Sequence, residues 1–330
     1  MRRDAMSETE GTGGFYARVI KRLGRNARAG EHGPLESADA KRLWHDLLAE
    51  RFTPAQEAAL LMGLRVHGES AAMLAAFARV TLDASSRVAA PPDKAVVVLH
   101  CLGTARKQPI LAPLLAFALA RAEVPVLMVT HDARRGANTA AVLGALAERA
   151  ADDAHDAALQ LARRCFAWVP IERIAPGLAR VLARRAELGF RNSAHSLVKL
   201  LVPIEGDGVV VANYTHAPYR QSFAQAAHLL RLSALLVRGT EGDPVAWEAD
   251  AHPSLAWIGG EPTGSPVQAE VIAGEPASLP QVADTDATAR FTEDVLQGQL
   301  PMPAPIARQY ECLAYLAATA ADPAQRRQAA

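Results

Sequence analysis

Hydrophobic positions recur with a helical period through the first part of the chain. From residue 15 to about residue 86 the apolar side chains return every three or four positions, which predicts a small helical bundle. Two helix starts carry capping residues, namely Thr53 with Pro54 and Gln56 behind it, and Ser70. Residues 90–92 read Ala-Pro-Pro and predict a linker.

After the linker, the pattern changes to short apolar runs that alternate with helical runs. Strands are predicted at residues 96–100, 126–130, 165–169, 209–212 and 235–238. Helices are predicted at residues 110–121, 138–149, 157–163, 175–188, 193–201, 219–232 and 305–321. Strands joined by helices indicate a mainly parallel sheet. The Pro- and Gly-rich residues 242–281 are expected to hold one or two short strands, such as residues 267–272.

The predicted fold class is therefore α/β, with a small helical domain and a larger α/β domain. We expect a disordered tail over residues 1–14, a helical domain over 15–88 and an α/β domain over 93–330. One helix pair of the α/β segment can rejoin the helical domain. The chain has 330 residues and is 50% hydrophobic, which is enough for the cores of two domains.

Charge is balanced over the whole chain but is unevenly distributed. The formal net charge is zero, so the molecule as a whole is not a general binder of polyanions. Residues 163–191 nevertheless hold seven arginines and two glutamates, whereas residues 239–289 hold nine carboxylates and no lysine or arginine. These runs indicate either local binding surfaces or solvated helix faces.

The three cysteines are far apart and show no metal-ligand spacing. We expect them to be reduced, as in a cytoplasmic protein. No apolar segment is long enough to predict a membrane span or a signal region, so no membrane partner is expected.

The most informative motif is the corner that follows the strand at residues 96–100. Residues 103–108 read Gly-Thr-Ala-Arg-Lys-Gln. A strand, a Gly-containing turn and a helix form the usual phosphate site of α/β proteins. Because Arg106 and Lys107 stand where a glycine-rich loop would offer bare backbone, we expect side chains to bind the phosphate.

Residues 51–70, beginning Arg-Phe-Thr-Pro-Ala-Gln-Glu-Ala, resemble the N-terminal helical signature of anthranilate phosphoribosyltransferases. The order of the later motifs is also similar: a phosphate corner, a His131-containing loop after a strand, and a Gly-Phe-Arg segment at residues 189–191. The resemblance covers about residues 15–325. It implies the nucleoside phosphorylase/phosphoribosyltransferase type of fold, with a cleft between the domains, and a homodimer joined through the helical domain.

The chain departs from these enzymes at each motif. They carry Gly-Thr-Gly-Gly-Asp at the corner, Lys-His-Gly-Asn at the next loop and an adjacent Asp-Glu pair for magnesium. This chain has Thr-Ala-Arg-Lys after Gly103, His-Asp-Ala-Arg-Arg from His131, and Glu241 and Asp243 separated by a glycine. Glu241 and Asp243 either share a cation or are solvated loop carboxylates. The corner and the segment Arg-Asn-Ser-Ala-His from Arg191 instead resemble the YbiB branch, which is described as binding nucleic acid without sequence preference.

Cations that follow a groove suffice to bind single-stranded nucleic acid through its phosphates. The first hypothesis is therefore sequence-independent binding of single-stranded DNA or RNA, without catalysis and without a cofactor. The alternative is a phosphoribosyl or glycosyl transferase with an altered acceptor, which alone would need Mg²⁺. A third hypothesis is a protein-interaction dimer without a ligand. The candidate phosphate-binding residues are Gly103, Thr104, Arg106, Lys107, Gln108, His131, Arg134, Arg191, Asn192, His195 and Lys199.

Overall fold

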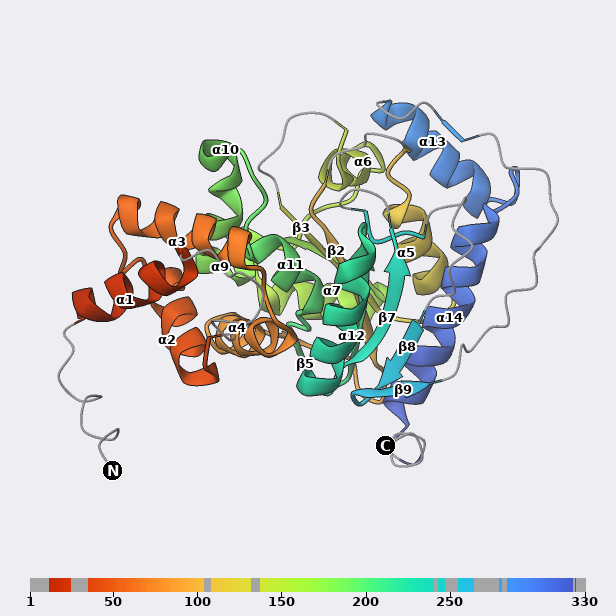
Figure 1. The fold of residues 1–330 in the computed structure, drawn as a ribbon. Coiled ribbons are helices and arrows are strands. Elements are labelled where there is room, and N and C mark those ends of the chain that lie inside the picture. The colour runs from red at the N-terminus through yellow and green to blue at the C-terminus, as the bar shows by residue number, and fades with distance from the viewer. Residues whose placement is uncertain are drawn as a thin grey trace.

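The chain folds into a helical part and a larger α/β part (Figure 1). The computed structural model describes residues 12–24, 35–103, 108–131, 137–239, 243–246, 255–263, 279–280, 284–322 and 324. The helical part lies at one end of the molecule, and the last two helices of the chain lie at the other. This is the two-part α/β architecture that the pattern of helices and strands predicts.

Four helices form the N-terminal helical part: α1 (Thr12–Gly24), α2 (Ser37–Leu48), α3 (Pro54–His67) and α4 (Ala71–Asp83). Trp44 of α2 stacks on Phe77 of α4 with ring centroids 4.4 Å apart. The indole N–H of Trp44 donates to the Thr81 hydroxyl at 2.8 Å, so this buried polar atom is satisfied. The stacked pair fixes α2 against α4.

Both predicted helix starts are confirmed. The Thr53 hydroxyl accepts from the amide of Gln56 at 3.3 Å, and the Gln56 side chain accepts from the amide of Thr53 at 3.0 Å. This reciprocal capping box satisfies two amides that the first turn leaves without helical partners. The Ser70 hydroxyl accepts from the amide of Met73 at 3.2 Å and begins α4 in the same way.

The α/β part is built on a seven-stranded sheet with the order β4-β3-β2-β6-β7-β8-β9. All five predicted strands are present. They are β2 (Val96–Cys101), β3 (Val126–Thr130), β4 (Phe166–Pro170), β6 (Gly208–Tyr214) and β7 (Ser233–Arg238), and all pair in parallel. A separate parallel pair joins β1 (Val88–Ala89) to β5 (Ile204–Glu205).

Helices cover both faces of this sheet. Val96 and Val98 of β2 pack into one core and Val97 and Leu99 into the other, because alternate strand residues point to opposite faces. The first core includes residues of α7 (Ala154–Arg164), α8 (Ile171–Ile174), α9 (Pro176–Ala183), α11 (Ala194–Leu197) and α12 (Ala217–Leu230). The second includes residues of α5 (Ala112–Arg121), α6 (Thr139–Ala145), α13 (Thr285–Leu296) and α14 (Ala304–Ala321).

Some elements differ from the prediction. Strands β8 (Leu255–Ile258) and β9 (Glu261–Thr263) are antiparallel additions in the Pro/Gly-rich segment, and α13 was not predicted. The predicted strand at 267–272 lies outside the described residues. The helix predicted at 175–188 is divided into α9 and α10 (Arg185–Leu188). The one predicted at 193–201 is the single turn of α11 followed by a 3-10 turn (Val198–Leu200), and Pro203 disfavours its continuation.

Helix α9 packs against the helical part at α2. A Cβ on Gly177 of α9 would lie 2.9 Å from the Leu48 carbonyl oxygen, so only glycine allows this close approach. Glu57 of α3 accepts from Arg180 Nη1 at 2.8 Å and from Arg184 Nε at 3.1 Å. A glycine contact and an ion cluster thus join the two parts.

Cys101, Cys165 and Cys312 are free thiols. Within the described part of the chain, no helix has both the length and the apolar character needed to cross a membrane.

Candidate functional site

The carboxyl ends of the parallel strands define where a ligand site is expected. The chain runs outward from β2 through β3 to β4, and then returns to place β6 and β7 on the other side of β2. The strand order therefore reverses between β2 and β6, and ligands of open α/β sheets bind beside such a point. The corner after β2 and the loop after β3 both leave the sheet at this edge.

The corner itself is only partly described. Gly103 is partly exposed at the end of β2, and Gln108 is buried just before α5. Thr104, Arg106, Lys107 and Arg134 lie outside the described residues. Their assignment as phosphate ligands stays a prediction.

The start of α5 is occupied by a carboxylate of the chain itself. Asp243 Oδ2 accepts from the amide of Leu111 at 3.0 Å, and Asp243 also accepts from the amide of Ala112. Asp243 is 1% exposed, and burial raises the pKa of its carboxyl to about 7 against the opposing effect of these two amides. The first amides of α5 are therefore engaged, and the corner has to bind an anion by other groups.

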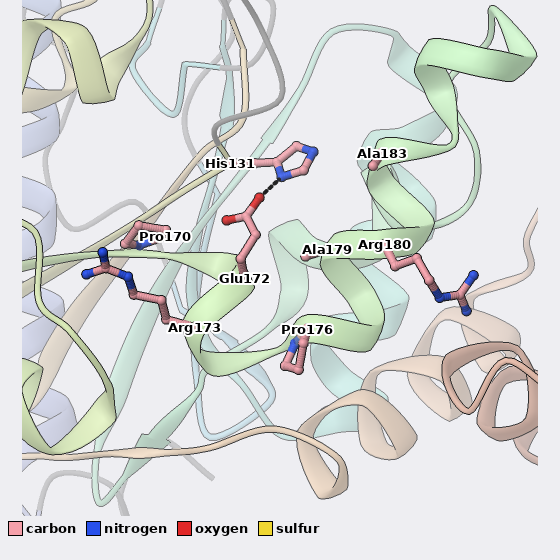
Figure 2. Close-up of a pocket in the computed structure, with 8 residues that line it drawn as sticks. All are labelled: His131, Pro170, Glu172, Arg173, Pro176, Ala179, Arg180 and Ala183. Atoms are coloured by element: carbon pink, nitrogen blue, oxygen red, sulfur yellow. Dashed lines mark hydrogen bonds and ion pairs between the residues drawn. The ribbon is translucent and has the colours of Figure 1, made fainter.

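His131 lies directly after β3 and contacts a residue that follows the neighbouring strand. Its Nδ1 lies 2.6 Å from Oε1 of Glu172 in α8 (Figure 2). The His131 side chain is 9% exposed, and that of Glu172 is 42% exposed. The structure places His131 Nδ1 against a carboxylate, and the assignment of His131 to phosphate stays a prediction.

The predicted residues Asn192, His195 and Lys199 come from one short segment that passes beside this edge. Asn192 is buried, and its side chain donates to the Val181 carbonyl at 2.7 Å and accepts from the amide of Ala194 at 3.1 Å. Lys199 Nζ donates to the Asn213 carbonyl at 2.7 Å. The Asn192 side chain therefore links its own segment to α9 through hydrogen bonds to the backbone. The Lys199 ammonium faces a backbone oxygen of β6.

Positive charge is concentrated along the same segment. Burial first, and then Arg185 and Arg191, lower the pKa of His195 to about 3. Burial and then Arg191 lower the pKa of Lys199 to about 7. His195 is therefore neutral near neutral pH, and the fixed positive charge beside it comes from the Arg185 and Arg191 guanidinium groups.

The segment is also joined to the helical part. The Ser193 hydroxyl donates to Glu69 Oε1 at 2.6 Å, and Glu69 lies just before α4. Burial raises the pKa of the Glu69 carboxyl, although its hydrogen bond with Ser193 opposes the shift. This hydrogen bond connects the segment that contains Arg191 to the residue before α4.

The described carboxylates do not fit a magnesium site. Asp243 is enclosed and binds the start of α5, and Glu241 lies outside the described residues. No group of three or more His, Cys, Asp or Glu side chains among the described residues is arranged to hold a metal ion.

Comparison with known proteins shows which proteins share this sequence pattern and fold. Residues 18–85 match the helical bundle domain of a glycosyl transferase family. The uncharacterized protein YbiB of Escherichia coli is 28% identical over 301 residues, which cover 90% of this chain and 92% of that protein. The anthranilate phosphoribosyltransferase of Rhodospirillum rubrum is 28% identical over 284 residues, which cover 80% of this chain and 77% of the enzyme.

Solved structures show the same fold. The anthranilate phosphoribosyltransferase of Thermus thermophilus superposes with a TM-score of 0.69 at 20% identity, covering 95% of this chain and 91% of that enzyme. The Saccharomyces cerevisiae enzyme in complex with PRPP and Mg superposes with a TM-score of 0.65 at 16% identity, covering 90% and 85%.

The helical part, the mainly parallel sheet and its edge define the phosphoribosyltransferase type of fold. In both sequence and fold, the chain is similar to YbiB and to anthranilate phosphoribosyltransferases.

Sequence reasoning missed Glu172, Arg185 and the capping role of Asp243. Glu172 had a readable signal, because it follows a buried strand just as His131 does. In the sheet Thr130 of β3 pairs with Pro170 of β4, so side chains beyond these two ends meet. Asp243 gave no such signal, since its contact with α5 joins residues 132 positions apart.

Proposed function

We propose that this protein binds a phosphoribosyl ligand of the phosphoribosyl pyrophosphate class at the carboxyl edge of its sheet, as a transferase with an altered acceptor. The observation that carries the proposal is that the guanidinium groups of Arg185 and Arg191 both lie near His195, in the segment beside that edge. The likeness to anthranilate phosphoribosyltransferases in both sequence and fold supports the choice of ligand.

The residues present would act on the phosphates directly. Arg191 would neutralise phosphate oxygens, with Arg106 and Lys107 joining from the corner. Charge-assisted hydrogen bonds from guanidinium groups are short and strong, and the planar fork fits two phosphate oxygens. Leaving pyrophosphate would in this case be stabilised by fixed cations.

A second candidate function is binding of single-stranded DNA or RNA through its phosphate backbone. The observation that favours it is the enclosure of Asp243, which removes one of the two carboxylates available near the corner for metal-dependent transfer. A polymer of phosphates needs cations along a groove and no metal. A homodimer formed through the helical part and a cytoplasmic location remain predictions under either function.

Isothermal titration of the full chain with phosphoribosyl pyrophosphate, with and without MgCl₂, tests the first function. We expect binding without magnesium and a loss of affinity of about 10-fold or more in Arg191→Ala, because one charge-assisted hydrogen bond is removed. Arg163→Ala is the matched control, since Arg163 is exposed on α7. No heat of binding at millimolar ligand, or equal affinities for the two variants, would refute this function.

Fluorescence anisotropy with a labelled oligothymidylate at about 50 and about 200 mM salt tests the second function. Each phosphate neutralised contributes a slope of roughly −0.7 in log affinity against log salt. We expect Arg106→Ala/Lys107→Ala to reduce that slope and Arg163→Ala to leave it unchanged. Binding absent at the lower salt concentration would exclude the second function and leave the first as it stands.

A further inference from the structure

A cavity of about 500 Å³ lies at the ends of β3 and β4, beside the cationic segment. It is lined by His131, Pro170, Glu172, Arg173, Pro176, Ala179, Arg180 and Ala183 (Figure 2). This volume is typical of sites for small organic molecules. The Asn192 side chain donates to the carbonyl of Val181 in α9, and the same helix supplies Ala179 and Ala183 to the lining, so the cavity and the candidate phosphate site adjoin each other.

The two arginines that line the cavity are already engaged elsewhere. Arg173 Nη1 donates to the Ala151 carbonyl and lies 3.2 Å from Asp152 Oδ1. Arg180 points away from the cavity in Figure 2 and binds Glu57 of the helical part. The other two polar lining residues, His131 and Glu172, bind each other in the wall of the cavity.

The hydrogen bond between these two residues fixes the state of the imidazole. An ionised carboxylate only accepts, so the 2.6 Å contact requires that Nδ1 of His131 carries the proton and donates it to Glu172. In the neutral ring Nε2 is then the basic atom. Figure 2 shows this second nitrogen directed away from Glu172, on the side of Ala183. An imidazole held by a carboxylate at one nitrogen, with the other nitrogen directed away from that carboxylate, is the arrangement of a general base.

We propose that His131 and Glu172 form an acid–base pair that takes the proton from the acceptor of a phosphoribosyl transfer. This inference rests on the proposed function and adds the catalytic group to it. In the step, a nitrogen or oxygen of the acceptor bonds to C1 of the ribosyl group. The C1–O bond to pyrophosphate breaks, and its electron pair leaves on the pyrophosphate oxygen. The acceptor's proton moves to Nε2 of His131, while Glu172 orients the ring and stabilises the imidazolium.

The first test reads the protonation of the ring itself. Long-range ¹H–¹⁵N spectra of the full chain with labelled histidine, recorded in alkaline buffer, should show His131 with a proton on Nδ1 and none on Nε2. The variant His131→Asn identifies the signal by its loss. A proton on Nε2 in the parent chain would overturn the proposal, because the basic nitrogen would then face Glu172.

The second test measures pyrophosphate release from phosphoribosyl pyrophosphate with anthranilate as the acceptor probe. His131→Asn can still donate to Glu172 but has no base, so kcat should fall by about 10² to 10⁴-fold. KM for phosphoribosyl pyrophosphate should stay within about threefold. Glu172→Gln keeps an acceptor oxygen but loses the charge and should lower kcat by at least about 10-fold.

His228→Asn is the matched control for this test. His228 also pairs with a carboxylate, Glu261 at 3.5 Å, but the pair is exposed on α12 and β9. It should leave kcat unchanged. If the parent chain binds phosphoribosyl pyrophosphate but releases no pyrophosphate, or if His131→Asn turns over normally, the acid–base pair is refuted while binding stands. If phosphoribosyl pyrophosphate does not bind in the titration, the proposed function is refuted, and the catalytic role of the His131–Glu172 pair is refuted with it.

Discussion

Replacing Asp243 by asparagine should remove a pH-dependent part of the stability of this fold. The carboxyl is 1% exposed, and burial raises its pKa from the ordinary 3.8 to about 7. Between those two values the folded chain keeps a proton that the unfolded chain has released. Stability therefore falls as the pH rises through this window, because the folded state binds more protons than the unfolded state.

A pKa difference from 3.8 to about 7 changes the free energy of unfolding by at most about 4 kcal/mol, because each pKa unit corresponds to about 1.4 kcal/mol. In Asp243→Asn the oxygen that accepts from the amides of Leu111 and Ala112 can remain while the ionisation is lost. The free energy of unfolding of the variant, relative to the parent, should therefore rise by up to about 4 kcal/mol between pH 4 and pH 7. The new amide N–H₂ adds an offset that does not change with pH.

Urea unfolding followed by circular dichroism at several pH values from about 4 to about 8 measures this difference. Asp83→Asn is the matched control, since the Asp83 side chain is 78% exposed and its neutralisation should leave the pH dependence of the parent unchanged. Parallel curves for Asp243→Asn and the parent would refute the reasoning, because they would mean that Asp243 is ionised in the folded chain at every pH tested.

Two further substitutions test how the helical part is held. Glu57→Ala removes the 2.8 Å partner of the Arg180 guanidinium, which keeps Glu50 at 3.5 Å, and should reduce the free energy of unfolding by about 1–3 kcal/mol; an unchanged urea midpoint would contradict this. Gly177→Ala places a Cβ 2.9 Å from the Leu48 carbonyl oxygen and should cost about 1–3 kcal/mol. Gly144→Ala is its counterpart in α6, where a Cβ would meet nothing within 4 Å, and should stabilise the chain by about 0.5–1 kcal/mol in the same assay. Equal effects of the two glycine substitutions would show that packing at Gly177 is not the cause.

Much of the fold follows from local sequence patterns. The capping residues Thr53 and Ser70 mark helix starts that the structure reproduces, and the apolar runs predict the five parallel strands of the main sheet. These features depend on neighbours within a few positions. Strands β8 and β9 were missed because β8 is a strand only through its pairing with β7, which a local pattern does not indicate. The surrounding Pro and Gly residues also favour a loop.

The candidate site was harder to predict because it depends on contacts between distant residues. Sequence alone brought together His131, Arg191 and His195 through a resemblance, and the structure sets them near one edge. The sequence does not show that the side chains of Asn192 and Lys199 donate to backbone carbonyls within the fold. Partner choice for such side chains is decided by the packing of whole elements, which periodicity does not encode.

The carboxylate of Asp243 holds the start of α5 independently of the corner at residues 103–108. Its bond to Leu111 crosses 132 positions of sequence, so the helix is anchored by a residue that the corner does not contain. A substitution within the corner would not remove either partner of the hydrogen bond between Leu111 and Asp243.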